Sequence, residues 1–226
     1  MLVNVKLSIF DIETKNTDLC PIFAGRYFKG VKNVQSPDWL QQKLKAVGLR
    51  PISALVDITN FVMLDLNRPL HVYDADKIDG KIIVRESKKG ESFNALDEKS
   101  YDLKEGMCAI ADEKKVLGLG GIMGGESSGC NESTENVLLE SALFNPINIA
   151  KSGRNLSIIS DARYRFERGV DPQSVLIGID RATELISEIC GGEISEVVIA
   201  GKIPENDKSV DLSVKRIQKR LGILLD

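Results

Sequence analysis

The stretch ISALVDITNFVMLDLNRPLHVYD, residues 52–74, decides how the rest of the chain is arranged. Its apolar residues recur every three or four positions, a spacing that predicts an amphipathic helix with one buried stripe. The stripe consists of Leu55, Ile58, Val62 and Leu66. Ser53 is expected to cap the start of this helix. The sequence Asn67-Arg68-Pro69 is expected to end it, because proline cannot continue a helix.

The stretch holds the pair Thr59-Asn60 inside its apolar run, and it holds His71, which is the only histidine of the chain. Threonine and asparagine side by side are unfavourable inside a helix, because both compete for backbone hydrogen bonds. His71 is expected on the loop that leaves the helix, from which it can fold back toward it. The pattern alone leaves two interpretations open: satisfied polar residues at the edge of the core, or members of a functional site.

The composition is that of an ordinary soluble globular protein, with 42% hydrophobic and 28% charged residues among 226. This length fits one large domain, or one domain with attachments. The net charge is −3 and the pI is about 5.4. These values argue against strong autonomous binding to nucleic acid, which needs clustered positive charge. Weak contacts within a larger assembly remain compatible with them.

The cysteine usage and the chain start indicate the compartment. The four cysteines are far apart and form no Cys-x-x-Cys pair: Cys20, Cys108, Cys130 and Cys190. With a single histidine they predict no zinc site, and free thiols are expected. The N-terminal residues lack the apolar core of a signal peptide, and no run reaches the roughly 18 apolar residues of a membrane span. We therefore expect a cytoplasmic location, no membrane segment and no metal site.

Strands and helices are both predicted along the rest of the chain. Strands are expected at residues 3–13, 23–33, 81–86, 136–144, 162–168 and 193–201, and hairpins at 92–103 and 107–119. Helices are expected at 36–48 with Ser36 as cap, from Pro146 with Asn145 as cap, at 172–190 and at 213–221. In the strand expected at 162–168, Arg163, Arg165 and Glu167 share one face, which is interpreted as solvent-exposed.

A glycine-rich run, GLGGIMGGESSG, occupies residues 118–129. No lysine follows it, so it does not match the phosphate-binding loop G-x-x-x-x-G-K-[ST]. The pattern G-x-G-x-x-G does not fit either, because Met123 stands where the last glycine is required. A nucleotide site is therefore not expected here. The glycines are expected to allow a tight turn and a close backbone approach, for packing or for a ligand.

One carboxylate lies inside the apolar strand NVLLESALF, residues 136–144. By strict alternation Glu140 shares a face with Leu138 and Ala142. A buried carboxylate among such neighbours is unusual. Two interpretations stay open: a strand edge at which Glu140 is solvated, or a buried group with a function.

Five motifs, in this order, resemble the central editing module of the β subunit of bacterial phenylalanine–tRNA ligase: SPDWLQQKLKAVGLRPIS, VDITNFVMLDLNRPLHVYD, LGLGGIMGG, LLESALFNP and RYRFERGVDP. The resemblance covers roughly residues 20–201. Two departures are visible: Asn67-Arg68 stands where Gly-Gln is common, and Val72-Tyr73 stands where Ala-Phe is common.

The resemblance implies an α+β fold with layered β-sheets packed against helices. It implies three parts: lead-in strands from a preceding module at residues 1–35, the central tRNA-editing module at 36–205, and the truncated start of a next module at 206–226. The implied activity is hydrolysis of tyrosine wrongly attached to tRNA(Phe).

The resemblance also assigns roles to individual residues. The implied catalytic residues are His71, Thr59 and Asn60. His71 would orient or deprotonate a water, and the other two would hold the ester or the terminal adenosine. The implied substrate-binding residues are Glu140, Gly121, Gly124, Ser160 and Ala162. No serine or cysteine stands in a nucleophile motif such as G-x-S-x-G, which favours a positioned water over a covalent intermediate.

The implied partners are tRNA(Phe) carrying tyrosine and an α subunit, in a heterotetramer of two α and two β subunits. ATP and Mg²⁺ would be used by the whole enzyme, and no cofactor is expected in this segment. The alternative is a catalytically silent module for tRNA docking and subunit interaction. A free-standing amino-acid-binding protein is a third interpretation, against which a tail that stops within a further module counts.

Overall fold

The computed structural model describes residues 10–205 and 209–222 of the chain. Its strands are β1 (Ile12–Thr14), β2 (Ile22–Lys29), β3 (His71–Asp74), β4 (Ile82–Glu86), β5 (Ser92–Asn94), β6 (Ser100–Asp102), β7 (Cys108–Ala111), β8 (Val116–Leu119), β9 (Met123–Gly124), β10 (Asn136–Leu143) and β11 (Glu193–Gly201). Its α-helices are α1 (Asp38–Ala46), α2 (Ala54–Leu66), α3 (Pro146–Leu156), α4 (Asp161–Phe166), α5 (Ser174–Ile189) and α6 (Val214–Leu221). Short 3₁₀ turns are η1 (Ala75–Lys77) and η2 (Glu126–Ser128).

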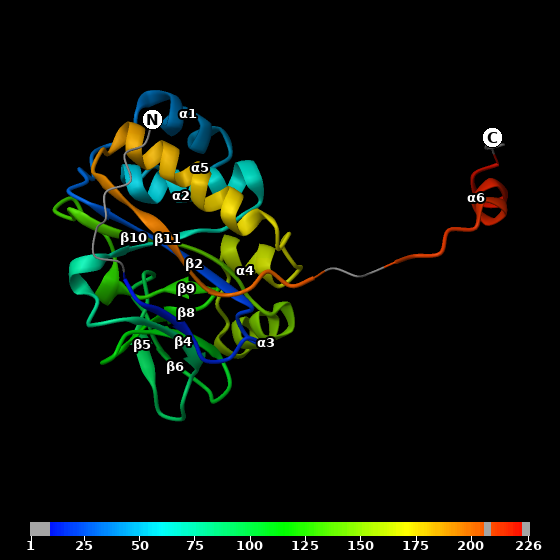
Figure 1. Cartoon of the computed structure of the whole chain (residues 1–226), viewed down its shortest axis with the longest axis horizontal. Coiled ribbons are helices and arrows are strands. Elements are labelled where there is room, and N and C mark those ends of the chain that lie inside the picture. Colours follow the sequence, from blue (N-terminus) through cyan, green and yellow to red (C-terminus); the bar gives the residue numbers. More distant parts are fainter. Residues whose placement is uncertain (1–9, 206–208, 223–226) are drawn as a thin grey trace.

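These elements confirm the α+β fold class, with layered sheets packed against helices. A four-stranded sheet has the order β11-β2-β10-β3, and a five-stranded sheet has the order β1-β4-β7-β8-β9. The strands β5 and β6 form a separate hairpin. Figure 1 shows α1, α2 and α5 on one side of the four-stranded sheet and the five-stranded sheet on its other side.

Strand β10 decides which side chains lie between the two sheets. It pairs antiparallel with β2 on one side and with β3 on the other. The hydroxyl of Ser141 donates to the carbonyl of Val175 on α5 at 2.7 Å, so Ser141 faces the helices. Because successive side chains of a strand point to opposite faces, Glu140 faces the five-stranded sheet. The interpretation of Glu140 as a solvated strand edge is wrong, since only 5% of the residue is exposed.

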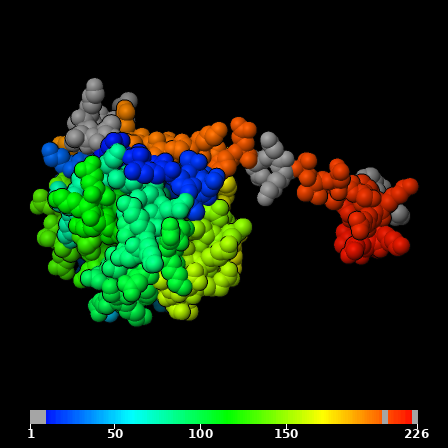
Figure 2. Space-filling model, turned by 90° about the horizontal axis from the view of Figure 1, so that it is seen from below, coloured from blue at the N-terminus to red at the C-terminus, as the bar shows by residue number. Residues whose placement is uncertain are grey.

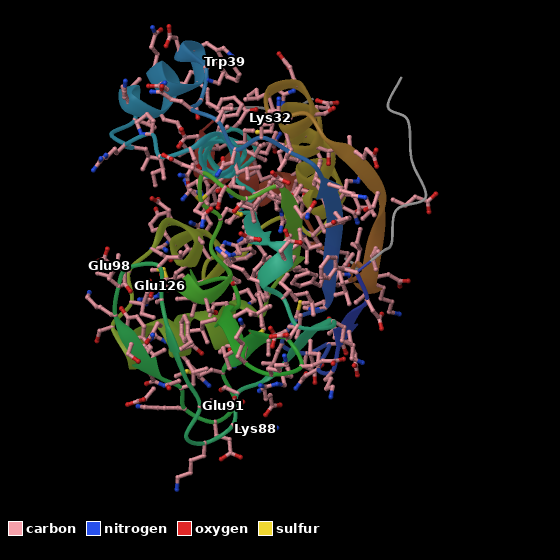
Figure 3. The ribbon with its side chains drawn as sticks, turned by 90° about the vertical axis from the view of Figure 1, so that its left-hand side faces the viewer. Lys32, Trp39, Lys88, Glu91, Glu98 and Glu126 are labelled. Atoms are coloured by element: carbon pink, nitrogen blue, oxygen red, sulfur yellow. The ribbon has the colours of Figure 1, made fainter. Side chains whose placement is uncertain are left out.

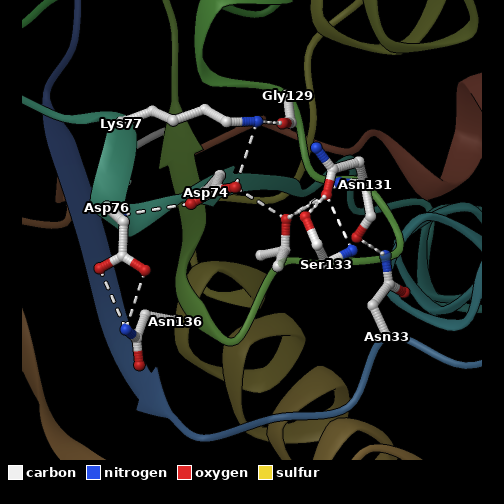
Figure 4. A network of polar contacts seen from close by, with 9 residues as sticks. Asn33, Asp74, Asp76, Lys77, Gly129, Asn131, Ser133 and Asn136 are labelled. Carbon is white, nitrogen blue, oxygen red and sulfur yellow. Dashed lines mark hydrogen bonds and ion pairs between the residues drawn. The ribbon is translucent and has the colours of Figure 1, made fainter.

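A polar network joins the end of β3 to the loop that follows the glycine-rich run (Figure 4). The carboxylate of Asp74 accepts from Thr134 Oγ1 at 2.8 Å and lies 3.2 Å from Lys77 Nζ. Lys77 Nζ also donates to the carbonyl of Gly129 at 2.8 Å. Asn136 at the start of β10 donates to Asp76 at 2.9 Å. These contacts fix the end of β3 against the loop that precedes β10 and against the first residue of β10.

The helix predicted in the opening stretch is confirmed as α2, and Asn67 ends it in the left-handed conformation with a φ of 52°. Ser53 lies at the cap position, but its side chain makes no capping hydrogen bond. The carboxylate of Asp57 instead accepts from the amide of Ile52 at 2.8 Å and from the hydroxyl of Ser36. Ser36 is therefore not the cap of α1, which begins at Asp38 after Pro37.

Two local predictions near the site are wrong. His71 does not lie on a loop: it is the first residue of β3 and pairs with Glu140 of β10. Residues 161–166 form the helix α4 and not a strand. The hydroxyl of Ser160 accepts from the amide of Arg163 and caps this helix. The pairs Arg163–Glu167 and Asp161–Arg165 are then one turn apart and form ion pairs at 3.0 Å.

Most of the other predicted elements are present. The two hairpins form as β5–β6 and β7–β8. The amide groups of Ile147 and Asn148 donate to the side chain of Asn145, which caps α3 as predicted. Helices α5 and α6 and strand β11 agree with the predicted segments 172–190, 213–221 and 193–201. Of the strand expected at 3–13, residues 3–9 lie outside the described part of the chain.

The division of the chain at residues 36 and 206 stays a prediction. Strand β2, which precedes residue 36, pairs with both β10 and β11 in the four-stranded sheet. In Figures 1 and 2 the segment that carries α6 lies apart from the main body of the described chain, and none of the residues of this helix is buried. Within residues 10–205 and 209–222, none of the helices combines the length and the apolar character that crossing a membrane requires.

Arg68 is a fully buried cation that joins three elements. It follows α2, and its Nε donates to Ser174 Oγ at 2.9 Å. Its Nη1 donates to the carbonyl of Ala142 on β10 at 2.7 Å, and its Nη2 donates to the carbonyl of Asp171. Burial lowers the pKa of Arg68 to about 10, so it stays charged at neutral pH. The planar fork of a guanidinium suits acceptors that lie in several directions.

We expect Arg68→Lys to lower the free energy of unfolding by about 2 kcal/mol, because one ammonium cannot reach all three acceptors and a buried unpaired acceptor costs about 1–3 kcal/mol. Urea unfolding of the chain measures this difference. Arg181→Lys is the matched control, since Arg181 forms an exposed ion pair with Glu184 and should change stability by less than about 0.5 kcal/mol. Equal stabilities of the two variants would contradict the bridging role of Arg68.

Candidate active site

A pocket with a volume of about 70 Å³ opens between the two sheets. One water molecule needs only about 10–15 Å³ of such volume, so the pocket can hold several waters or a small chemical group. Strands β3, β7, β8, β9 and β10 contribute to its wall, together with α4. The lining residues are Pro69, Leu70, His71, Tyr73, Ile110, Gly118, Leu119, Gly121, Ile122, Met123, Gly124, Glu140, Ala162 and Phe166.

The polar groups of the pocket come from the paired strands β3 and β10. His71 lies directly opposite Glu140, and Tyr73 lies two residues further along the same face of β3. The phenol of Tyr73 donates a hydrogen bond to the carboxylate of Glu140. The rings of His71 and Tyr73 meet edge to face, with 4.4 Å between their centroids. Two adjacent strands thus place an imidazole, a phenol and a carboxylate side by side.

Burial shifts the ionisation of these groups in opposite directions. It raises the pKa of Glu140 to about 7, although the hydrogen bond from Tyr73 works against this shift. It lowers the pKa of His71 to about 4, because the charged imidazolium would lose its hydration. His71 is therefore neutral at pH 7. Its Nε2 is buried against Gly124 and has no hydrogen-bond partner among the described residues.

The glycine-rich run closes one side of the pocket. A Cβ added to Gly124 would lie 2.4 Å from Cε1 of His71, so a side chain at this position would require the imidazole to move. Gly121 has a φ of +66°, and a Cβ there would lie 2.8 Å from the ring of Phe144. The glycines at these two positions therefore permit the close backbone approach expected from the sequence.

Helix α4 forms the wall next to this run. The hydroxyl of Ser160 donates to the carbonyl of Ile122 at 2.7 Å, besides capping the helix. Ala162 lines the pocket, while Ser160 does not. Phe166 packs edge to face on Phe144 with 5.1 Å between ring centroids. Ser160 thus positions the glycine-rich run relative to α4 from behind the pocket wall.

The structure therefore brings together some of the site residues predicted from the sequence. His71, Glu140, Gly121, Gly124 and Ala162 line one pocket.

The remaining predicted catalytic residues, Thr59 and Asn60, do not line this pocket. Thr59 is buried and its hydroxyl donates to the carbonyl of Val56 within α2, at 2.8 Å. Asn60 is half-buried on the same helix. The roles expected of these two residues stay predictions.

The sequence reasoning missed Tyr73 as a member of the site. A signal was present, since alternation in the strand His71–Asp74 puts Tyr73 on the same face as His71. Cys108 was also missed as a neighbour of the site. The pKa of its thiol is raised mainly by burial and to a smaller extent by the charge of Glu140. The four cysteines are free thiols. Among residues 10–205 and 209–222 there is no group of three or more His, Cys, Asp or Glu side chains that could bind a metal ion.

A family model and similar curated relatives agree on one family for this chain. A family model described as the B3/4 domain matches residues 19–191. The phenylalanine–tRNA ligase beta subunit of Bradyrhizobium diazoefficiens is 53% identical over 212 residues, which are 94% of this chain and 26% of that protein. The same subunit of Rhodospirillum rubrum is 52% identical over 217 residues, which are 96% of this chain and 27% of that protein. The chain thus spans about a quarter of the length of these relatives.

One solved structure supports the fold. It is an N-terminal fragment of the phenylalanyl-tRNA synthetase beta-subunit from Pyrococcus horikoshii, with a TM-score of 0.57 and 15% identity. The match covers 100% of this chain and 63% of that one. At this identity the likeness concerns the fold alone.

Proposed function

The chain belongs to the B3/4 domain family, and from this premise we propose that it is the tRNA-editing module of a phenylalanine–tRNA ligase β subunit. The proposed reaction is hydrolysis of the ester that joins tyrosine to tRNA(Phe). The observation that carries the proposal is the buried carboxylate of Glu140 opposite the neutral His71, in a pocket between two sheets. The identity to ligase β subunits supports the same assignment.

The need for such a site follows from the limits of apolar recognition. A pocket shaped for the phenylalanine ring cannot strongly reject tyrosine, which adds only a hydroxyl, and discrimination is then about 10²-fold. A second site that binds the hydroxyl reverses this logic. If Glu140 accepts the hydroxyl of tyrosine, phenylalanine leaves that carboxylate oxygen unpaired. Sites that hydrogen-bond a hydroxyl discriminate by about 10⁴ to 10⁵-fold.

Hydrolysis of an ester needs an attacking water, a proton acceptor and stabilisation of the oxyanion. In the proposed mechanism the imidazole of His71, which lines the pocket, holds or deprotonates the water. Backbone N–H groups of the glycine-rich run are proposed to stabilise the oxyanion. The nearby thiol of Cys108 is a poor nucleophile, because burial raises its pKa to about 12. A positioned water therefore suits this pocket better than a covalent intermediate.

The remaining parts of the reaction are proposed to lie outside this chain. The α subunit would attach phenylalanine with ATP and Mg²⁺, in a cytoplasmic heterotetramer of two α and two β subunits. Thr59 and Asn60 are proposed to contact the ester or the terminal adenosine where the tRNA end enters.

The test is a hydrolysis assay with the assembled enzyme that contains this β subunit. Tyrosyl-tRNA(Phe) and phenylalanyl-tRNA(Phe) are supplied in turn, and release of each amino acid is followed over time. We expect rapid release of tyrosine and slow release of phenylalanine. Release of both at the spontaneous rate would contradict the proposal and favour a silent tRNA-docking module.

A further inference from the structure

We infer that Tyr73 is a positioning residue that acts through Glu140: its phenol holds one carboxylate oxygen and leaves the other as the acceptor for a substrate hydroxyl. The inference rests on the proposed function, and it assigns the hydroxyl-reading element to a pair of residues. An ionised carboxylate has about four acceptor sites on two oxygens, so it can accept from an internal and an external hydroxyl together.

The geometry that supports this pair is set by β3 and β10. Tyr73 is 1% exposed and lies opposite Leu138, diagonal to Glu140. Its hydroxyl donates to Oε2 of Glu140. Within the described residues no hydrogen bond is made to Oε1, and Glu140 lines the pocket. One oxygen is thus engaged inside the protein while the other is left for the pocket.

The titration of Glu140 can be measured separately from that of the groups around it. They are His71 and Tyr73 on β3, Cys108 on β7 and Cys20 before β2. The pKa of His71 is about 4 and that of Cys108 is about 12, both because of burial. Burial also raises the pKa values of Tyr73 and Cys20 well above their ordinary values. Between about pH 6 and 8.5, Glu140 is therefore the one group of these five that changes its protonation.

The hydrogen bond from Tyr73 keeps Glu140 ionised against the effect of burial. It lowers the pKa of Glu140, which burial raises to about 7. Removing one such hydrogen bond should raise that pKa by about one unit, which lowers the ionised fraction at pH 7 about five-fold. A protonated carboxyl group is a weaker acceptor for the substrate hydroxyl. A variant without the phenol should therefore be less selective for tyrosine near pH 7. Raising the pH should restore its selectivity, because Glu140 is then ionised again.

The first experiment follows the Glu140 carboxyl carbon by ¹³C NMR in the full chain, as pH is raised from 5 to 9. We expect a midpoint near pH 7 in the parent and a midpoint about one unit higher in Tyr73→Phe. Tyr101→Phe is the matched control, because Tyr101 also donates its phenol to a carboxylate, that of Asp97, at 2.7 Å. This pair lies in the β5–β6 hairpin, whose turn residue Glu98 is labelled at the edge of the molecule in Figure 3. The control should leave the Glu140 midpoint unchanged.

The second experiment measures the ratio of tyrosyl- to phenylalanyl-tRNA(Phe) hydrolysis by the assembled enzyme, at pH 7 and pH 8.5. Tyr73→Phe should lower the ratio about five-fold at pH 7 and restore it at pH 8.5. Adding Tyr73→Phe to Glu140→Gln should produce no pH-dependent change, since the amide does not titrate. The inference would be overturned if Tyr73→Phe left the Glu140 midpoint unchanged. It would also be overturned if the Tyr73→Phe enzyme were active and had the same hydrolysis ratio as the parent at pH 7. If the parent enzyme hydrolyses neither substrate, the proposed function fails, while the NMR midpoint still decides whether Tyr73 holds Glu140.

Discussion

His71→Ala is expected to slow hydrolysis of tyrosyl-tRNA(Phe) by about 10² to 10⁴-fold, the usual contribution of a positioned acid or base. The reason is that His71 lines the pocket and that none of the described residues makes a hydrogen bond to its Nε2. Because burial lowers the pKa of His71 to about 4, the imidazole is neutral at pH 7 and can accept a hydrogen bond from the attacking water. Single-turnover hydrolysis by the assembled enzyme measures the effect.

His71→Phe separates the nitrogen from the ring. It keeps an aromatic ring against Tyr73 but provides no proton acceptor. We expect this variant to be as slow as His71→Ala, with a folded state of similar stability, since no internal hydrogen bond to Nε2 is lost. Protonation of His71 should cause a further fall of the parent rate as the pH approaches about 4, below the change near pH 7 that protonation of Glu140 produces. If the His71→Phe enzyme kept the parent rate, the role of His71 would be packing and not proton transfer.

Glu140→Ala is expected to remove the preference for tyrosine and not simply the rate. A hydrogen bond to a charged group contributes about 1.5–3 kcal/mol, which corresponds to about 10 to 150-fold in recognition of the tyrosine hydroxyl. The same change removes the buried oxygen that phenylalanine would leave unpaired, so exclusion of phenylalanine relaxes as well. Glu140→Gln should be intermediate, because its amide oxygen still accepts a hydrogen bond but carries no charge.

The measurement is the ratio of tyrosyl- to phenylalanyl-tRNA(Phe) hydrolysis for each variant in the assembled enzyme. Glu91→Ala is the control for loss of a carboxylate elsewhere. Glu91 pairs with Arg85 at 2.7 Å outside the pocket, and its replacement should leave the ratio unchanged. If Glu140→Ala retained the parent ratio, Glu140 would not be the acceptor of the tyrosine hydroxyl.

Sequence reasoning succeeded where the determinants of structure are local. The helix α2 followed from the spacing of Leu55, Ile58 and Val62 and from the stop at Asn67, all of which lie within one stretch. The cap of α3 by Asn145 and the hairpin turns followed from the same kind of local signal. The family motifs added the pocket members His71 and Glu140, whose polar character within apolar runs had left two interpretations open.

The errors arose where distant segments or short helices decide the outcome. His71 belongs to a strand only because β10, far later in the chain, pairs with it. The alternating residues 162–168 fit a period of two, but the cap at Ser160 and ion pairs one turn apart stabilise a six-residue helix instead. The contact between Tyr73 and Glu140 also depends on the register of two strands, which no local pattern specifies.

The position of β3 at the end of its sheet has a consequence for motion. Within the described chain β3 has a strand neighbour on one side only, β10, and it is four residues long. Strands of this kind open with lower free energy than the centre of a sheet. Amide hydrogens of residues 71–74 should therefore exchange with solvent faster than those of β10. An occupant held by both His71 and Glu140 would bridge the two strands and slow that exchange, so the pocket gains rigidity at the moment it is filled.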